Sequence, residues 1–202
     1  MFIGLHSFAA TVHGGVFINE IHYDNIGGDT GEFVEIAGPA GTDLSGWSIQ
    51  LYRDSGTVYD TITFSGTLAD AGFGFGFATS FQTIQNGPSD GLALIDNGSV
   101  VQFLSYEGTL TGASGTTADG LTSTDIGVGE NSSTPVGFSL QLTGTGTQYS
   151  DFTWTGPSAA TAGSVNTGQT FGSSQVIPEP GSFAIFGVGM VASCLIGRRR
   201  RS

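Results

Sequence analysis

The chain has 202 residues, with 34 glycines, 15 phenylalanines, one cysteine and no lysine. Its formal net charge is −12, but four of its five arginines lie at 198–201, so residues 1–177 carry 16 acidic side chains against Arg53 alone, a net charge of −15. Such an acidic region argues against nucleic acid as a partner, because phosphates are bound chiefly through Lys and Arg. The lack of cysteine before Cys194 excludes disulfides, thiol nucleophiles and thiolate metal sites from it.

Residues 1–15 resemble the end of a secretory signal peptide. Apolar residues such as Phe2, Ile3 and Leu5 are followed by Ala9 and Ala10, small residues that suit cleavage. No Lys or Arg precedes them, so the positively charged start of a signal peptide is missing. Either the start codon lies further upstream, which we favour, or the signal is atypical; in both cases we expect the chain to be exported.

Between its two ends the sequence alternates short apolar runs with turns rich in Gly, Asp and Asn. No helical period is sustained, whereas nine segments have the composition of strands: 16–23, 32–37, 47–52, 59–64, 73–78, 92–95, 100–105, 139–142 and 152–154. Asn97-Gly98 predicts a tight hairpin between two of them. Many short antiparallel strands predict an all-β, Ig-like sandwich, and the Gly/Ser/Thr-rich stretch 108–134 predicts a long, partly ordered surface excursion.

Three ordered motifs give this sandwich a closer resemblance. They are Asn19-Glu20-Ile21, Glu32-Phe33-Val34-Glu35-Ile36 and Asp43-Leu44-Ser45-Gly46-Trp47, and a closing Gly163-Ser164-Val165-Asn166-Thr167-Gly168-Gln169 follows far along the chain. Together they resemble the lamin-tail domain, an Ig-like family, over residues 16–171. At Ala37-Gly38-Pro39 many members have Asn before the Pro, so the match is looser in that loop.

We expect Asn19, Glu35 and Trp47 to define the fold. A polar side chain buried among apolar strands must be hydrogen-bonded, and a Trp after Gly46 offers a large apolar plate to the interior. The alternative is a catalytic carboxylate pair of Glu20 with Glu35, but no base, nucleophile or electrophile accompanies it. The sequence also lacks a nucleophile elbow and a phosphate-binding loop. We therefore expect no enzymatic activity and no cofactor.

The loop between the first two predicted strands is the best metal candidate. Asp24, Asn25, Asp29 and Glu32 offer hard oxygen ligands on a Gly-rich segment, the ligand type that Ca²⁺ prefers. Their spacing is not that of an EF-hand. The other interpretation is a turn in which Asp and Asn side chains bond to their own backbone.

The C-terminus has three features in a fixed order: Pro178-Glu179-Pro180, an uncharged and mostly apolar stretch at 182–197, and the cluster Arg198, Arg199, Arg200 and Arg201. As a helix the apolar stretch would span about 24 Å. That is short for a hydrocarbon core of about 30 Å, so snorkelling arginines or a thinned bilayer would have to help. The arginines should stay cytoplasmic. A buried helix of the globular domain is the alternative, which the terminal arginines disfavour.

This order resembles the PEP-CTERM sorting signal of Gram-negative bacteria, over residues 178–202 after a linker at 172–177. The resemblance implies an exosortase, a membrane-embedded transpeptidase, as partner, and removal of the tail after an inner-membrane stage. Hydropathy alone would equally fit a permanent single-pass anchor. We expect a non-catalytic module at the cell surface or in an extracellular matrix or biofilm, with adhesion or structural roles and polysaccharide as a candidate ligand. The alternative is an accessory domain of secreted nuclease or phosphoesterase activity.

Overall fold

The computed structural model describes residues 15–172; most of the predicted signal segment and linker, and the whole sorting tail, lie outside this range. It contains β1 (Phe17–His22), β2 (Phe33–Pro39), β3 (Trp47–Tyr52), β4 (Val58–Thr63), β5 (Phe75–Phe81), β6 (Gly91–Asp96), β7 (Ser99–Ser105), β8 (Thr124–Asp125), β9 (Phe138–Gly146), the 3-10 helix η1 (Tyr149–Asp151), β10 (Phe152–Ala159) and β11 (Gln169–Phe171). Between residues 15 and 172 no helix is long and apolar enough to cross a membrane, and the span predicted at 182–197 falls outside.

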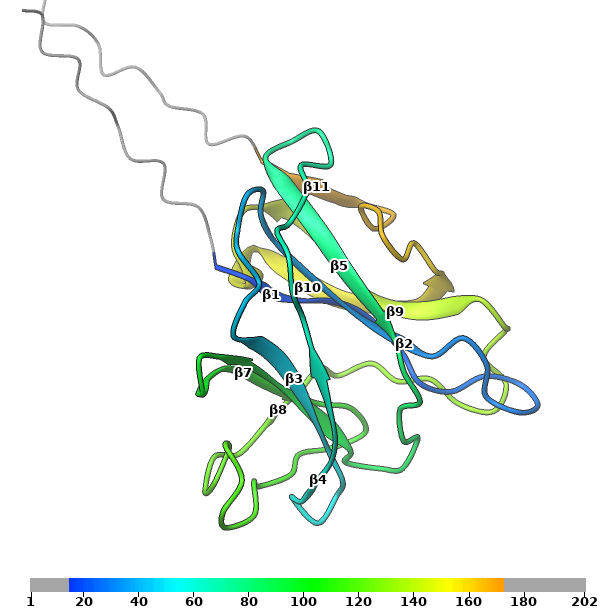
Figure 1. Ribbon diagram of the computed structural model, residues 1–202. Helices are drawn as coiled ribbons and strands as arrows, with labels where there is room; N and C mark the ends of the chain where they lie inside the picture. Colours follow the sequence, from blue (N-terminus) through cyan, green and yellow to red (C-terminus); the bar gives the residue numbers. More distant parts are fainter. Residues whose placement is uncertain (1–14, 173–202) are drawn as a thin grey trace, which may run out of the picture.

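The strands form two sheets, which confirms the all-β prediction (Figure 1). The first has the order β10-β9-β1-β2-β5, with β11 added to β9, and the second has the order β4-β3-β6-β7-β8. Pairing is antiparallel except for β11 with β9 and β8 with β7. Each of the nine segments predicted as strands overlaps one of the observed strands.

The predicted hairpin joins β6 to β7. Asn97 and Gly98 have φ angles of 45° and 80°, the two positive values that a type I′ turn requires. Asn and Gly tolerate this left-handed backbone better than other residues, so the local sequence fixes the register of the two strands.

Apolar residues of both sheets share one core. Ile18, Ile21 and Ile36 of the first sheet belong to the same buried cluster as Ile49 and Leu94 of the second. A smaller cluster lies on β3, β6 and β7 and is closed by Leu110 and Ala118 of the 108–134 excursion. This excursion is therefore ordered, and part of it covers one face of the second sheet.

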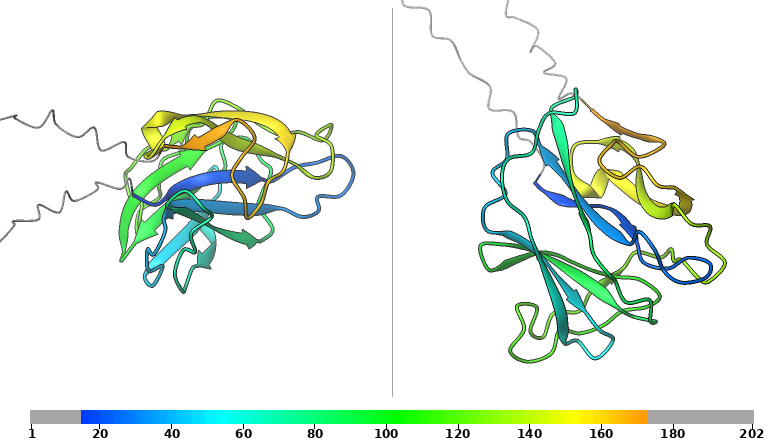
Figure 2. Two further views of the ribbon diagram at one scale, coloured as in Figure 1. Left: turned by 90° about the horizontal axis from the view of Figure 1, so that it is seen from above. Right: turned by 45° about the vertical axis from the view of Figure 1, so that its right-hand side comes forward.

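The first sheet is covered by the end of the chain. After β10 the chain crosses this sheet and adds β11 beside β9; we call residues 160–171 the C-terminal strap (Figure 2). Phe171, the last residue of β11, stacks on Phe75 with ring centroids 4.4 Å apart and also contacts Phe17 and Phe152. The strap thus encloses side chains of the first sheet that would otherwise face solvent.

Candidate functional site

Two carboxylates face each other beneath the strap. Glu20 of β1 is the register partner of Glu35 of β2, and both are fully buried. The register shifts between Ile18 and Glu20, so Asn19 is the extra residue of a β-bulge. A bulge re-aims side chains, and like charges directly opposite in a sheet destabilise it. The pair therefore has to be stabilised by hydrogen-bond donors.

Neutral groups supply these donors to Glu20. Ser139 Oγ donates to Glu20 Oε1 at 2.6 Å, and Gln141 Nε2 donates to the same oxygen at 3.2 Å. From the strap, Thr161 donates twice, through its backbone N to Oε1 at 2.8 Å and through Oγ1 to Oε2 at 3.0 Å. Both carboxylate oxygens are thus occupied, half of their donors coming from the strap.

Glu35 and Asn19 connect the two strands to the strap. Glu35 accepts from Asn19 Nδ2 at 3.0 Å, from Thr79 Oγ1 at 2.7 Å and from the backbone N of Gly163 at 2.5 Å. Gln169 Nε2 donates to Asn19 Oδ1 at 2.7 Å. The two residues expected to define the fold therefore hold the strap directly.

Asn166 closes the network. Its Nδ2 donates to the backbone oxygens of Asn19 (3.1 Å) and Leu142 (3.0 Å), and its Oδ1 lies 2.9 Å from Thr161 Oγ1, whose single proton serves either this oxygen or Glu20 Oε2. The side chain joins the bulge of β1, strand β9 and the strap through one buried amide.

The carboxyl group of Glu35 has a pKa of about 7, well above its ordinary value. Burial is the main cause and the charge of Glu20 adds to it, whereas the three hydrogen bonds that Glu35 accepts lower the pKa.

Trp47, the third residue expected to define the fold besides Asn19 and Glu35, has a different environment. It begins β3 and packs against the main core, but it is only half-buried. The fully buried side chains of β3 are Ile49, Leu51 and Tyr52. The ring of Trp47 therefore lies at the margin of the core and not in its interior.

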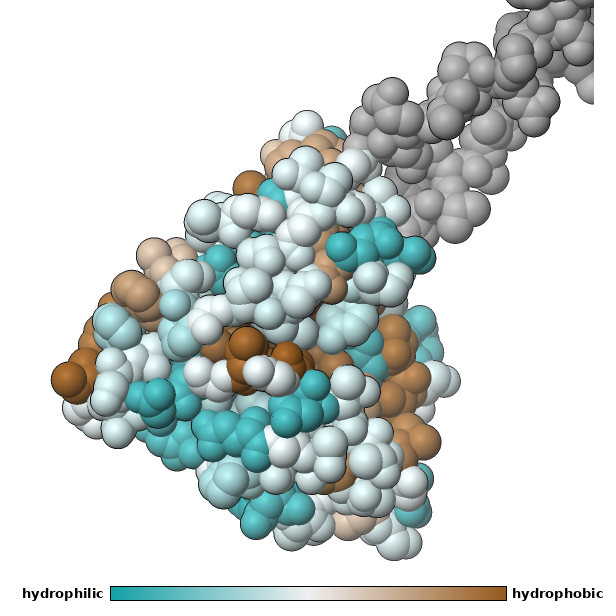
Figure 3. Space-filling model, turned by 180° about the vertical axis from the view of Figure 1, so that it is seen from behind, coloured by the Kyte–Doolittle hydropathy of each residue, from teal (hydrophilic) through white to brown (hydrophobic). Residues whose placement is uncertain are grey.

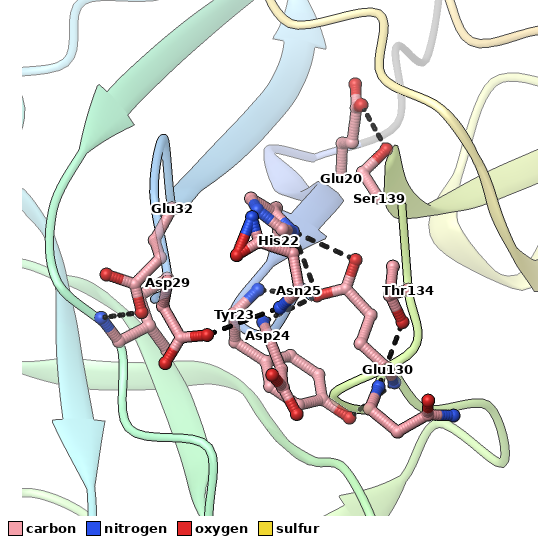
Figure 4. A network of polar contacts seen from close by, with 12 residues as sticks. Glu20, His22, Tyr23, Asp24, Asn25, Asp29, Glu32, Glu130, Thr134 and Ser139 are labelled. Atoms are coloured by element: carbon pink, nitrogen blue, oxygen red, sulfur yellow. Dashed lines mark hydrogen bonds and ion pairs between the residues drawn. The ribbon is translucent and has the colours of Figure 1, made fainter. Parts of the chain in front are cut away.

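A second buried polar cluster ties the excursion to the end of β1 (Figure 4). Glu130 accepts from His22 Nδ1 at 3.0 Å and from the backbone N of Tyr23 (2.6 Å) and Asp24 (3.0 Å). His22 Nε2 lies 3.3 Å from the backbone oxygen of Thr30, so both ring nitrogens face acceptors. Burial lowers the pKa of His22, but the hydrogen bond and charge of Glu130 outweigh this and raise it above its ordinary value.

Three of the four calcium candidates accept hydrogen bonds through their side chains: Asn25 and Asp29 within the loop, and Glu32 from a residue distant in the sequence. Asn25 Oδ1 accepts from the backbone N of Thr30, and Asp29 Oδ1 accepts from the backbone N of Asn25, both at 3.3 Å. Glu32 Oε1 accepts from the backbone N of Ile84 at 3.2 Å. Burial and the negative charge of Asp29 raise the pKa of Asp24. These contacts describe a turn, and in the described part of the chain no three His, Cys, Asp or Glu side chains are grouped to hold a metal ion.

A groove of about 720 Å³ opens beside the strap. Its wall includes the exposed side chains of Phe81 (68%) and Val136 (60%) and the side chains of Phe33, Phe138, Thr161 and Ser164. No acidic residue lines it, although the domain is strongly acidic elsewhere. Apolar residues appear in small separate groups on the face shown in Figure 3. The groove therefore offers apolar side chains and hydroxyl groups, with His22 as the one titratable side chain that lines it.

Comparison with known proteins identifies one feature of the chain. The family model described as the PEP-CTERM protein-sorting motif matches residues 176–201, outside the described residues. The comparisons return no match to a lamin-tail domain, and neither curated proteins nor solved structures give a significant match. The motif indicates a chain that is sorted by an exosortase-type system and routed through membrane processing to the cell surface.

Proposed function

We propose that this chain, which carries a PEP-CTERM sorting motif, is a non-catalytic surface or extracellular-matrix protein of a Gram-negative bacterium. The single observation that carries the proposal is the position of the motif. It begins at residue 176, five residues after β11 ends at Phe171, so the folded domain directly precedes the sorting signal. In this proposal residues 182–197 cross the inner membrane until an exosortase removes the tail.

We further propose that the domain is a lamin-tail-like Ig sandwich. In support, the expected motifs lie together in space: Asn19 in β1 and Glu35 in β2 hydrogen-bond each other, and both contact the strap that contains Asn166. The two-sheet architecture is compatible with this assignment. The motif residues would then be conserved by their role in closing the fold.

The proposed role is adhesion or structure, with neutral polysaccharide as the candidate ligand. The carboxylates Glu20 and Glu35 are buried and occupied by donors, which favours a structural role over acid–base catalysis. A net charge of −15 over residues 1–177 repels phosphate-rich substrates, whereas the groove beside Phe81, which no acidic residue lines, suits a neutral polymer.

Deletion of residues 178–202 in the producing bacterium tests the sorting proposal. The full chain should be found at the cell surface, and the deletion should accumulate in the periplasm or medium, because it removes the Pro-Glu-Pro motif and the apolar segment together. Ser173→Ala with Ser174→Ala is the matched control just outside the motif and should localise like the parent. Unchanged fractionation of the deletion would show that the tail does not sort the protein.

A further inference from the structure

The two sheets end in five strands, and four of them are protected against pairing with another chain, among them β11 through its length of only three residues. β10 contains Pro157 and an irregularity in its register, β4 carries Asp60 beside a register shift in its pairing with β3, and β8 has only two residues, one of them Asp125. Proline, charge, bulges and shortness are the usual devices that keep edge strands from associating.

β5 has none of these devices. Its seven residues, Phe75–Phe81, contain no charge and no proline, and its pairing with β2 is regular over all seven positions. Phe75 O accepts from Ala71 N, but within residues 15–172 no other backbone hydrogen bond outside the β2 ladder involves this strand. The edge from Phe77 to Phe81 therefore presents unpaired backbone groups, and its last side chain is exposed.

The free part of β5 is complementary to itself. Residues 77–81 read Phe-Ala-Thr-Ser-Phe, so antiparallel pairing about Thr79 places Phe77 opposite Phe81, Ala78 opposite Ser80 and Thr79 opposite Thr79 of a second copy. Aromatic pairs and Thr–Thr pairs are among the favourable cross-strand combinations. The side chains at the alternate positions, Ala78 and Ser80, are small, so they do not obstruct an approaching strand.

We propose that two copies of this chain pair through their β5 strands, antiparallel and centred on Thr79, to join their first sheets into one continuous sheet. The exposed ring of Phe81 would then be covered by Phe77 of the second copy. A charge of −15 on each domain opposes the approach of two copies, and the strand β5 itself adds no charge to this repulsion. The proposal does not depend on the sorting function, and the two fail in different experiments.

Disulfide trapping of the full chain in detergent tests the register. Directly opposite residues lie within disulfide reach, whereas residue 78 lies two positions from its own counterpart, beyond the limit of about 7 Å. In a Cys194→Ser background, Thr79→Cys should therefore form a covalent dimer on oxidation, and Ala78→Cys should not. Thr153→Cys, exposed on the protected strand β10, is the matched control. Absence of the dimer with Thr79→Cys, or equal yields with Thr153→Cys, would overturn the proposal.

A second measurement leaves Thr79 intact, because this residue also donates to Glu35. Sedimentation of the detergent-solubilised full chain should show a dimer that strengthens with salt, which screens the repulsion between acidic domains. Phe81→Glu should raise the dissociation constant roughly tenfold, since two symmetry-related aromatic pairs are lost. Val101→Glu, at an exposed apolar residue on β7 of the second sheet, should leave it unchanged. A monomer at all concentrations, or a dimer equally sensitive or insensitive to both variants, contradicts β5 pairing.

Discussion

Replacement of Asn166 by alanine should detach the strap from the first sheet. The change removes two hydrogen bonds donated to the backbone oxygens of Asn19 and Leu142 in a buried site, together with the contact between Asn166 Oδ1 and Thr161 Oγ1. At about 1 kcal/mol per lost bond, with an added cost for buried groups left unpaired, the free energy of unfolding should fall by about 2–4 kcal/mol. For a domain of this size the melting temperature should fall by about 5–15 °C.

Thermal unfolding followed by circular dichroism measures this effect, with Thr167→Ala as the control. Thr167 is the exposed neighbour of Asn166 in the strap, so its replacement should change the melting temperature little. Asn166→Asp should be worse than alanine, because it turns an oxygen toward two carbonyl oxygens and adds charge near Glu20. If Asn166→Ala melts within about 2 °C of Thr167→Ala, the amide does not hold the strap and the reasoning is wrong.

Three further changes test other parts of the structure. Because the pKa of Glu35 is raised to about 7, its contribution to stability is full below its ordinary value of about 4.5 and is lost as the pH rises through 7. Glu35→Gln should therefore flatten the fall in melting temperature between pH 5 and 8, leaving the slope due to His22, which has the same sign because its pKa is also raised. Trp47→Ala should lower the free energy of unfolding by about 2 kcal/mol, less than the roughly 3–5 kcal/mol lost when a fully buried ring is removed. An unchanged melting temperature would show that the ring does not pack against the core. Calcium should not shift the melting temperature, and a chelator-reversible shift lost in Asp29→Ala would instead establish a site in that loop.

The sequence predicted those parts of the fold that local patterns determine. Apolar runs between Gly and Asn turns gave the nine longer strands, and Asn97-Gly98 gave a turn of the right type. β8 and β11 were missed because strands of two and three residues have no periodicity of their own. They are strands only because Leu104 and Gly144 offer them partners.

The contacts between segments that are distant in the sequence could be predicted less well. Asn19 and Glu35 were recognised as polar residues that need partners, but nothing local pointed to Thr161 or Gly163 as the donors. Glu130 was missed altogether, since its partner His22 lies 108 positions earlier and a single Glu in a Gly-rich stretch looks like a solvated residue. Trp47 shows the opposite error. A tryptophan was expected inside the sandwich because its side chain is large and apolar, but Trp47 stands at the start of β3, where its ring is only half-buried.

The strap also bears on when the chain can fold. Asn19 and Gln169, which hydrogen-bond each other, are separated by 150 positions, and β1 has β9 as its neighbour in the sheet. Contacts of such high sequence separation form slowly, because a long loop must close before they contribute. A chain emerging from the ribosome therefore lacks the strap until residues 160–171 have been synthesised, and Glu20 and Glu35 lack their strap donors Thr161 and Gly163 before then. The first sheet consequently cannot complete its buried polar network while synthesis of the chain has reached only β10.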